Sequence, residues 1–138
     1  QYVPNRNMMM LSIAVSYAEA IGATKVFTGF QSTDEYAYWD TTSQFRKAFN
    51  DVIAQNRKNV ITVEAPFVGR NKSDLIQSGI KNGVQFDKTW TCYAGREKSC
   101  GKCPTCADRL KHFINLKLID PLEYEVEIPW DKYEGRAI

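Results

Sequence analysis

The feature of this sequence that most constrains its fold is the grouping of four cysteines in one short segment. The spacing is Cys-x7-Cys-x2-Cys-x2-Cys, the rest of the chain holds no cysteine, and the four positions are Cys92, Cys100, Cys103 and Cys106. Two-residue gaps allow tight turns, for which Gly101 and Pro104 are suited, to aim neighbouring sulfurs at one point. Four thiolates around one point are the ligand set of tetrahedral zinc, and they leave no position for water. The spacing therefore predicts one zinc ion with a structural rather than a catalytic role.

Two other uses of the four cysteines remain open at the level of sequence. Disulfides among Cys100, Cys103 and Cys106 would close short, strained loops, and cytoplasmic proteins rarely keep disulfides. An iron–sulfur cluster is the stronger rival, because Cys-x2-Cys-x2-Cys also occurs in ferredoxin-type sequences, although the fourth ligand there normally follows closely on the other side. We favour zinc, whose binding free energy of about 10–16 kcal/mol would be enough to decide whether this segment folds.

The composition gives little reason to expect a membrane or nucleic-acid partner. The 138 residues carry a formal net charge of +2 and contain no long run of one sign, so no polybasic surface is indicated. The longest strongly apolar stretch, residues 8–15, is far shorter than the roughly 20 residues of a membrane span, and no secretory leader is recognisable. We expect a cytoplasmic chain and, because Gln1 leads almost directly into a helical pattern, a part of a longer protein.

Hydrophobic periodicity predicts alternating helices and strands in the first part of the chain. Helices are expected from Arg6 to Ala20, after an N-cap at Thr41, Thr42 or Ser43, and from Asn71 to Gly83; strands are expected over residues 25–30 and 59–66. Alternation of this kind favours the α/β class, with a parallel sheet that is covered by helices. Because two parallel strands do not form a stable sheet alone, we expect further strands from a missing segment or another chain.

Three regions follow from these patterns. Residues 1–88 are assigned to the α/β domain, residues 89–120 to a zinc-binding helical region and residues 121–138 to an extended tail. In the tail, apolar side chains from Leu122 to Trp130 alternate with glutamates and a proline. A period of two is typical of an edge strand or of an extended arm laid over a surface.

Three polar residues lie at the starts of predicted helices, where backbone N–H groups favour an anion. Arg6 and Asn7 begin the first helix and could receive an anion there; the alternative is a capped helix with a solvated arginine. Lys72 stands in the first turn of its helix, an unfavourable place for a positive charge, and could serve a phosphate or a carboxylate; the alternative is an exposed lysine. His112, the single histidine, is expected to be a surface or packing residue, so no Ser-His-Asp arrangement can be assembled convincingly.

An acidic and aromatic loop follows the first predicted strand. It begins after Gly29 and carries Asp34, Tyr38 and Asp40. Ligands bind at the carboxyl ends of parallel strands in open α/β sheets, so a planar heterocycle could stack on the aromatic side chains while a carboxylate accepts its N–H groups. The alternative is a surface loop whose aromatic residues pack locally.

Several short motifs, in this order along the chain, resemble the carboxyl-terminal half of 7-cyano-7-deazaguanine synthases. The cysteine segment is the most specific of them. They are Tyr2-Val3-Pro4-Asn5-Arg6-Asn7, Thr28-Gly29, Thr33-Asp34, Tyr38-x-Asp40, Phe45-x-Lys47-Ala48, Ala65-Pro66-Phe67, Lys72, Thr91-Cys92-Tyr93 and Cys100-Gly101-x-Cys103-x-x-Cys106-x-x-Arg109.

The resemblance implies an adenine nucleotide alpha hydrolase-like fold with a doubly wound parallel sheet and a PP-loop enzyme that uses ATP as cosubstrate. Such enzymes convert 7-carboxy-7-deazaguanine and ammonia to 7-cyano-7-deazaguanine, a precursor of queuosine-type bases; they carry one zinc ion and are typically homodimers. The resemblance also implies a catalytic role for Lys72 and substrate-binding roles for a further set of residues. That set is Arg6, Asn7, Gly29, Asp34, Tyr38 and Asp40.

The chain departs from the pattern of these enzymes in ways that leave other functions open. It contains no Ser-Gly-Gly-x-Asp-Ser loop, which grips the pyrophosphate of ATP in the family, so we expect no catalysis by this chain alone. Asn5 stands where the family usually has glycine, and Trp39-Asp40-Thr41-Thr42 replaces the usual Pro-Asp-Cys-Arg. The alternatives are a relative that stops at the amide product and a zinc-stabilised binding module without catalysis.

Overall fold

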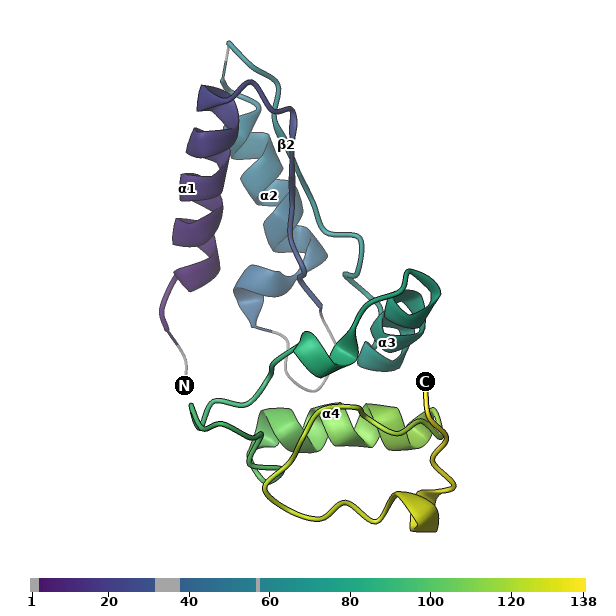
Figure 1. The fold of residues 1–138 in the computed structure, drawn as a ribbon. Coiled ribbons are helices and arrows are strands. Elements are labelled where there is room, and N and C mark those ends of the chain that lie inside the picture. The colour runs from purple at the N-terminus through teal and green to yellow at the C-terminus, as the bar shows by residue number, and fades with distance from the viewer. Residues whose placement is uncertain (1–2, 32–37, 57) are drawn as a thin grey trace. The chain divides into compact units, whose positions relative to one another are not determined.

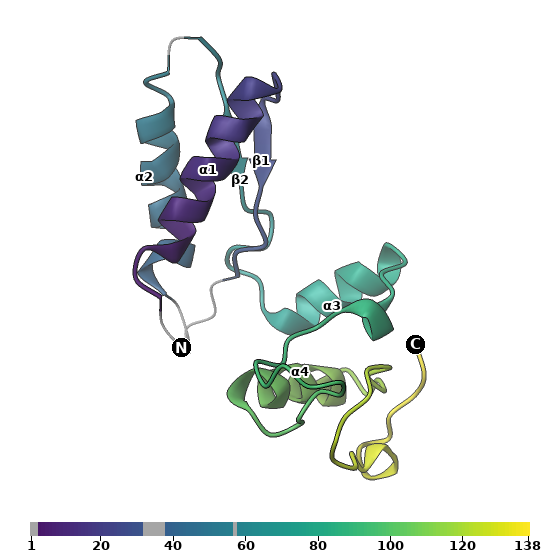
Figure 2. The same cartoon turned by 60° about the vertical axis from the view of Figure 1, so that its left-hand side comes forward.

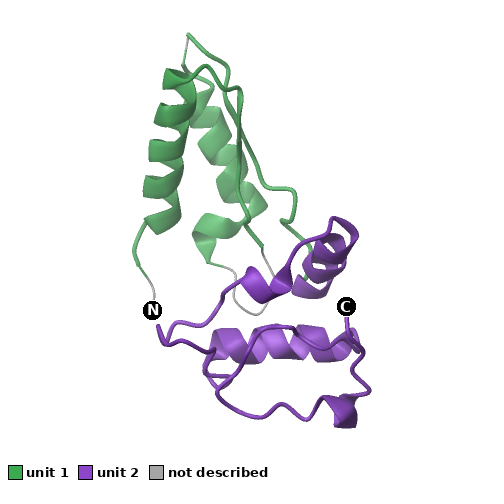
Figure 3. Ribbon diagram, viewed as in Figure 1, with its two compact units in different colours: residues 1–71 green, residues 72–138 purple. Residues whose placement is uncertain are grey.

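The structure is a computed structural model that describes residues 3–31, 38–56 and 58–138. It divides into two compact units, residues 1–71 and 72–138 (Figure 3). The first unit contains α1 (Arg6–Ala20), β1 (Lys25–Phe27), the 3-10 helix η1 (Trp39–Thr41), α2 (Ser43–Ile53) and β2 (Thr62–Glu64). The second contains α3 (Lys72–Lys81), η2 (Phe86–Lys88), α4 (Pro104–Asn115) and η3 (Trp130–Tyr133).

The first unit confirms the predicted α/β class, because its two strands pair in parallel. The register places Val26 opposite Val63, and Figures 1 and 2 show α1 and α2 running alongside the strand pair. Both helices pack on it through one apolar cluster. The buried members of that cluster are Leu11, Phe30, Phe45, Phe49 and Val63.

The free edge of β2 is occupied by a side chain from α2. The amide of Asn50 donates from Nδ2 to the carbonyl oxygen of Val63 at 3.0 Å and accepts at Oδ1 from the Val63 N–H at 2.7 Å. Since Val63 is fully buried, both backbone groups would otherwise lack a partner. Asn50 therefore blocks the addition of another strand at this position of β2, while the opposite edge of the pair belongs to β1.

The helix boundaries follow the predicted signals closely. The α1 helix has the predicted ends, and Gly22 just beyond it has a φ of 74°, the left-handed conformation that favours glycine. The hydroxyl of Thr42 caps α2 by accepting from the Phe45 N–H at 3.1 Å. Both strands are shorter than predicted because their pairing extends over only three residues each.

The α1 helix is buried on one side only, although its sequence, rich in apolar residues with few charges, is typical of a helix packed on most of its faces. Only Leu11 and Ala18 of α1 are buried, whereas Met10, Ile13 and Tyr17 are 63%, 68% and 66% exposed. The spacing of these exposed residues places them along one side of the helix. The short strand pair and α2 offer apolar surface to only one side of α1, so its apolar composition exceeds what this unit buries.

The second unit is built on a contact between α3 and α4. Its small apolar core contains Ile76, Phe113 and Leu118, and the ring of Phe86 meets Phe113 edge to face at a centroid distance of 5.6 Å. Within the described part of the chain, no helix combines the length and apolarity that crossing a membrane requires.

The tail of the second unit confirms the predicted alternation. From Pro121 to Trp130 exposed and half-buried side chains strictly alternate. One parallel bridge pairs Tyr124 with Ser99, through a Ser99 N–H to Glu123 carbonyl bond of 3.1 Å and a Glu125 N–H to Ser99 carbonyl bond of 2.8 Å. The tail is thus an extended arm that is hydrogen-bonded to the cysteine segment.

Candidate metal centre

The structure brings the four cysteines together from three local elements. Cys92 follows η2 in a loop, where the indole Nε1 of Trp90 donates to the Cys92 carbonyl oxygen at 2.8 Å. Cys100 precedes a turn at Gly101, whose φ of 70° suits glycine. Cys103 is the N-cap of α4, with Pro104 at its first position, and Cys106 lies in its first turn.

The sulfur positions fit one metal ion. All four Sγ atoms lie within 4.8 Å of one another, and those of Cys100 and Cys106 are 4.0 Å apart. Metal–sulfur bonds of about 2.3 Å in a tetrahedron would place the sulfurs roughly 3.8 Å apart. The cysteines are free thiols, so the structure contradicts the disulfide alternative. Cys92 and Cys106 are buried, and Cys100 and Cys103 are half-buried.

Backbone N–H groups surround the sulfurs and favour their ionised form. Cys92 Sγ accepts from the N–H groups of Cys100 and Ala94, both at 3.4 Å, and Cys103 Sγ accepts from that of Cys106 at 3.5 Å. The Cys100 and Ala94 bonds lower the pKa of Cys92. The Thr105 hydroxyl and the Cys106 N–H lower the pKa of Cys103 to about 5. The surroundings of Cys92 and Cys103 thus favour the thiolate form of these two ligands.

Cys106 behaves in the opposite way. Its side chain is fully buried, and burial raises the pKa of Cys106 to about 12, with further increases from the neighbouring sulfurs. Four thiolates in so small a volume repel one another unless a cation lies between them. The donor set therefore fits a metal ion, whose binding would release protons from the thiols that remain protonated.

A buried ion pair fixes α4 to the segments on either side of the cysteines. The Arg109 guanidinium donates to Asp120 from Nε at 2.5 Å and from a terminal nitrogen at 2.8 Å, and the Tyr124 hydroxyl donates to the same carboxylate at 2.7 Å. Arg109 also donates to the Thr89 hydroxyl and the Phe86 carbonyl oxygen, at 2.8 and 3.1 Å. α4, the residues before Cys92 and the tail are thereby joined through one guanidinium.

Burial and Asp120 act in opposite directions on Arg109. Burial disfavours its charge, but the hydrogen bonds and negative charge of Asp120 outweigh burial and raise the pKa of Arg109. Burial also raises the pKa of Tyr124, so this hydroxyl stays protonated and donates. The sequence motif marked Arg109 but gave no signal for its partner, because nothing local distinguishes Asp120 from the acidic residues of the tail that follows it.

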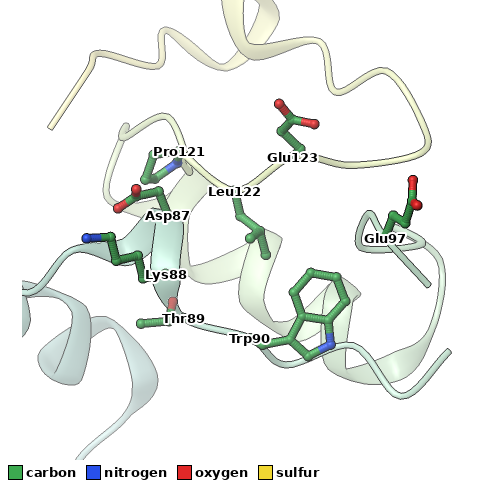
Figure 4. A pocket seen from close by; sticks show the side chains of 8 residues that line it. All are labelled: Asp87, Lys88, Thr89, Trp90, Glu97, Pro121, Leu122 and Glu123. Atoms are coloured by element: carbon green, nitrogen blue, oxygen red, sulfur yellow. The ribbon is translucent and has the colours of Figure 1, made fainter. Parts of the chain in front are cut away.

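A cavity of about 370 Å³ lies beside the cysteine segment (Figure 4). In Figure 4 the side chain of Leu122 points toward the indole of Trp90. The remaining lining is mostly charged: Asp87, Lys88, Thr89, Glu97, Pro121 and Glu123. None of the predicted site residues lines it, so this cavity is separate from the chemistry inferred from the sequence.

Of the predicted substrate-binding residues in the first unit, two are hydrogen-bonded to each other and three are exposed. The N–H of Asn7 donates to Asp40 Oδ2 at 3.2 Å, so a buried carboxylate of this chain occupies the N-terminus of α1. Arg6 and Gly29 are exposed, and Tyr38 is 46% exposed. Asp34 lies outside the described residues.

Lys72 forms an ion pair with Asp108 at the contact between α3 and α4. Asp108 is 3.4 Å from His112 Nε2, and His112 Nδ1 lies 2.8 Å from the Ser73 hydroxyl oxygen. Sequence reasoning missed both Asp108 and this use of His112. Positions 108 and 112 are one helical turn apart, which is the only signal that could have suggested their pairing.

A parallel α/β unit joined in one chain to a cluster of four cysteines defines an α/β protein with a candidate metal centre. The model of the family described as queuosine biosynthesis protein QueC matches residues 1–117. The chain therefore belongs to the QueC family, whose adenine nucleotide alpha hydrolase-like fold agrees with the predicted one.

Curated relatives support this assignment and confirm the resemblance found in the sequence. The 7-cyano-7-deazaguanine synthase of Caldicellulosiruptor saccharolyticus is 42% identical over 130 residues, which are 94% of this chain and 58% of the relative. Those of Psychromonas ingrahamii and Pseudoalteromonas atlantica are 43% and 44% identical over 123 residues, which are 89% of this chain and 56% of each relative. The chain thus spans little more than half the length of these relatives.

Proposed function

We propose that this chain is the zinc-bearing part of an enzyme that converts 7-carboxy-7-deazaguanine and ammonia to 7-cyano-7-deazaguanine at the expense of ATP. The observation that carries the proposal is the identity of 42–44% to proteins of that name over about nine-tenths of the chain. The cysteine cluster supports it, because the motif on which the resemblance chiefly depended forms a compact ligand set.

The metal is zinc in this proposal. A polynuclear iron–sulfur cluster holds its cysteines around several irons and would need the sulfurs farther apart than the 4.8 Å within which they lie. Four thiolates leave no open position, so zinc would take no part in the reaction. It would hold the Cys92 loop against the start of α4, and Cys92, Cys100, Cys103 and Cys106 would bind it.

The reaction requires two activations. The substrate carboxylate attacks the α-phosphorus of ATP and releases pyrophosphate; ammonia then displaces AMP from the acyl adenylate and gives the amide. The amide oxygen then attacks the α-phosphorus of a second ATP and releases pyrophosphate, and departure of that oxygen as AMP, with loss of both N–H protons, leaves the nitrile. The pyrophosphate-binding loop is not part of this chain, so ATP binding by the whole enzyme is inferred from the family alone.

The side chains of this chain would bind and orient the substrate. In the proposal, the exposed Tyr38 ring stacks on the deazapurine and Asp34 accepts its N–H groups. Asp40 is not proposed to contact the base, because its carboxylate is buried and accepts from the Asn7 N–H. Arg6 and the side chain of Asn7, whose backbone N–H is bound by Asp40, are proposed to approach the carboxylate or the nucleotide. Gly29 would leave the approach to the base open, and the Lys72 ammonium would stabilise negative charge that develops on transferred oxygen. The working enzyme is proposed to be a cytoplasmic homodimer without direct contact to nucleic acid.

The test is an activity assay of the full-length protein that contains this chain. The protein should consume 7-carboxy-7-deazaguanine, ammonia and ATP and yield the nitrile, identified by mass spectrometry. Lys72→Ala and Asp34→Ala should each lower kcat/KM by roughly a hundredfold or more, whereas Lys132→Ala, at an exposed residue of η3, should leave it unchanged.

Three outcomes would contradict parts of the proposal. Accumulation of the amide without nitrile would assign the chain to a relative that stops at the amide. Absence of turnover by protein with stoichiometric zinc would favour a zinc-stabilised binding module. Sedimentation as a monomer at the assay concentration would exclude the homodimer.

A further inference from the structure

Four polar side chains of α3 and α4 form a continuous series of contacts. Lys72 Nζ binds Asp108 Oδ2, Asp108 Oδ1 lies 3.4 Å from His112 Nε2, and His112 Nδ1 lies 2.8 Å from Ser73 Oγ. Because Ser73 directly follows Lys72, the series closes on itself through one peptide bond. All four residues belong to the second unit.

We propose that Asp108 is a positioning residue that fixes the ammonium of Lys72 for the reaction, and that His112 and Ser73 hold Asp108 in place. This inference rests on the proposed function, because it gives Lys72 a place in the chemistry. It adds three residues to which neither the sequence motifs nor the family resemblance assigned a role.

A lysine at this position needs a partner to be held. Its side chain has four rotatable bonds and loses conformational entropy when it is fixed. The first turn of a helix also disfavours a positive charge, because the N–H groups there carry partial positive charge. Asp108 compensates both effects by placing a carboxylate against Lys72 at a site where the two side chains are only 26% and 35% exposed.

The pairing leaves Lys72 available to a ligand. An ammonium group has three N–H donors, and the contact with Asp108 uses one of them. The remaining exposure of the side chain keeps the group accessible from solvent. A carboxylate that both neutralises and orients the lysine, without enclosing it, is the arrangement that a positioning residue requires.

The protonation state of His112 completes the arrangement. Burial lowers the pKa of His112; Lys72 and Lys111 lower it further, and Asp108 raises it. A neutral imidazole can donate from Nε2 to Asp108 only if Nδ1 accepts, and the Ser73 hydroxyl supplies the donor for Nδ1. Asp108 is thus held on one oxygen by His112 while its other oxygen holds Lys72.

The series also connects Lys72 to the metal centre. Asp108 lies two residues after Cys106 on α4, and Cys103 caps that helix. Whatever fixes the start of α4 therefore fixes Asp108, and through it the lysine. A structural metal would in this way contribute to catalysis without contacting the substrate.

A hydrolytic triad is a less favourable interpretation of the same residues. In the structure His112 lies between Ser73 and Asp108, as the histidine does in a Ser-His-Asp triad. The carboxylate of Asp108 is already paired with Lys72, however, and its distance to His112 is 3.4 Å. A carboxylate neutralised by lysine stabilises an imidazolium poorly. The geometry favours positioning of the Lys72 ammonium rather than activation of the Ser73 hydroxyl.

The experiment compares Asp108→Asn with Glu134→Gln in the longest protein that carries this chain. Glu134 pairs with Lys117 at 2.5 Å, but both side chains are well exposed, at 72% and 65%, so this surface pair is the matched control. Asp108→Asn should lower kcat roughly ten- to a hundredfold, as expected when a reacting group is displaced by about 1 Å. The KM for 7-carboxy-7-deazaguanine should stay within about twofold of that of the unmodified protein, since substrate binding is unaffected.

Further measurements separate positioning from folding. Zinc content and melting temperature of Asp108→Asn should match those of the unmodified protein, and Asp108→Glu should recover part of the lost kcat. An amine-acylating reagent, followed by peptide mass spectrometry, should label Lys72 several-fold faster in Asp108→Asn. Ser73→Ala, which spares both the metal segment and the ion pair, should lower kcat less than Asp108→Asn does.

The outcomes distinguish this inference from the proposed function. If the unmodified protein has no turnover, the proposed function fails and the inference with it. If Lys72→Ala abolishes turnover but Asp108→Asn keeps the unmodified kcat and labelling rate, the inference alone is overturned. Equal loss of zinc, melting temperature and activity in Asp108→Asn and Asp108→Glu would also overturn it, because Asp108 would then be only structural.

Discussion

The two units of this chain are stabilised in different ways. Residues 1–71 rely on apolar side chains, with a core of Leu11, Phe30, Phe45, Phe49 and Val63. Residues 72–138 have a smaller apolar core and instead bury charged and metal-binding groups: Cys92, Cys106, Arg109 and Asp120. The first unit therefore depends on area removed from water, and the second on specific polar contacts.

The difference also appears in what each unit leaves exposed. In the first, α1 presents Met10, Ile13 and Tyr17 to solvent, so more apolar surface is available than the unit itself buries. In the second, the tail places its half-buried side chains inward at every other position. A metal and a buried ion pair can replace apolar area in a small unit, but they make its stability conditional on every partner being present.

The largest test of this comparison is removal of the metal. Chelation should unfold the cysteine segment and the tail, because a structural site of this type contributes about 10–16 kcal/mol. Hydrogen exchange should then show loss of amide protection in η2, α4 and the tail. Protection in α2 and β2 should change much less, because their contacts contain no cysteine.

Cys106→Ser provides the matched genetic test. It removes a fully buried ligand and should reproduce the chelated state without a chelator. If α4 keeps its native amide protection in the chelated protein or in this variant, the apolar core of Ile76, Phe113 and Leu118 is enough to hold the second unit folded. The contrast between the units would then disappear.

Asp120→Asn should have the next largest effect. It leaves the Arg109 guanidinium, whose side chain is 5% exposed, without its counter-charge, and breaking one side of a buried pair costs about 3–5 kcal/mol. Denaturant unfolding monitored in the second unit would measure the loss. The exposed pair between Arg96 and Glu125 is the control, since Glu125→Gln should cost less than about 1 kcal/mol.

A double replacement sharpens the same test. Arg109→Met with Asp120→Leu removes both charges, and replacement of a whole buried pair by apolar residues is often tolerated. The double variant should be more stable than Asp120→Asn. If it is equally unstable, the hydrogen bonds of Arg109 to Thr89 and Phe86, together with that of Tyr124 to Asp120, matter more than the ion pair itself.

In the first unit the corresponding test is Asn50→Ala. Here a polar side chain serves a mainly apolar core by satisfying both backbone groups of the buried Val63. Its removal should cost about 1–3 kcal/mol, the usual penalty for buried groups left without partners. Asp51→Ala, one position further along α2 and exposed, is the control. An equal, small effect of both variants would mean that water replaces the amide at this edge.

The parts of the structure that the sequence predicted are those encoded over short distances. The ends of α1, the Thr42 cap, the glycine turns and the alternation of the tail all depend on neighbouring residues. The cysteine cluster could be predicted for the same reason, because its ligands occupy one short segment. The physical chemistry of turns and helix ends suffices for each of these features.

The contacts that define the second unit could not be predicted in this way. Lys72 and Asp108 are 36 residues apart, and Arg109 meets Asp120 from a different element. A charged residue has the same local pattern whether it is solvated or buried against a partner, so the sequence offered only an anion-binding or an exposed Lys72 and not an ion pair with Asp108. The strand lengths were mispredicted, and the exposed side of α1 was not predicted, because both depend on which segments are present to cover them.

The smallest predicted effect concerns His112, the one histidine of the chain. Because it lies in the second unit, its titration should change the stability of that unit and not of the first. Because burial lowers the pKa of His112, the unfolded chain binds more protons than the folded one as the pH falls below the ordinary value of about 6.5. The contribution of the neutral imidazole is complete above that pH and is lost on acidification. His112→Gln should therefore weaken the decline in stability of zinc-loaded protein between about pH 7.5 and pH 5.5. Protection of α2 should be the same in both proteins at each pH, since the first unit contains no histidine. An unchanged pH dependence in α4 would mean that folding does not lower the pKa of His112. The imidazolium would then form in the folded protein at low pH, and Nδ1 would donate to Ser73 instead of accepting from it.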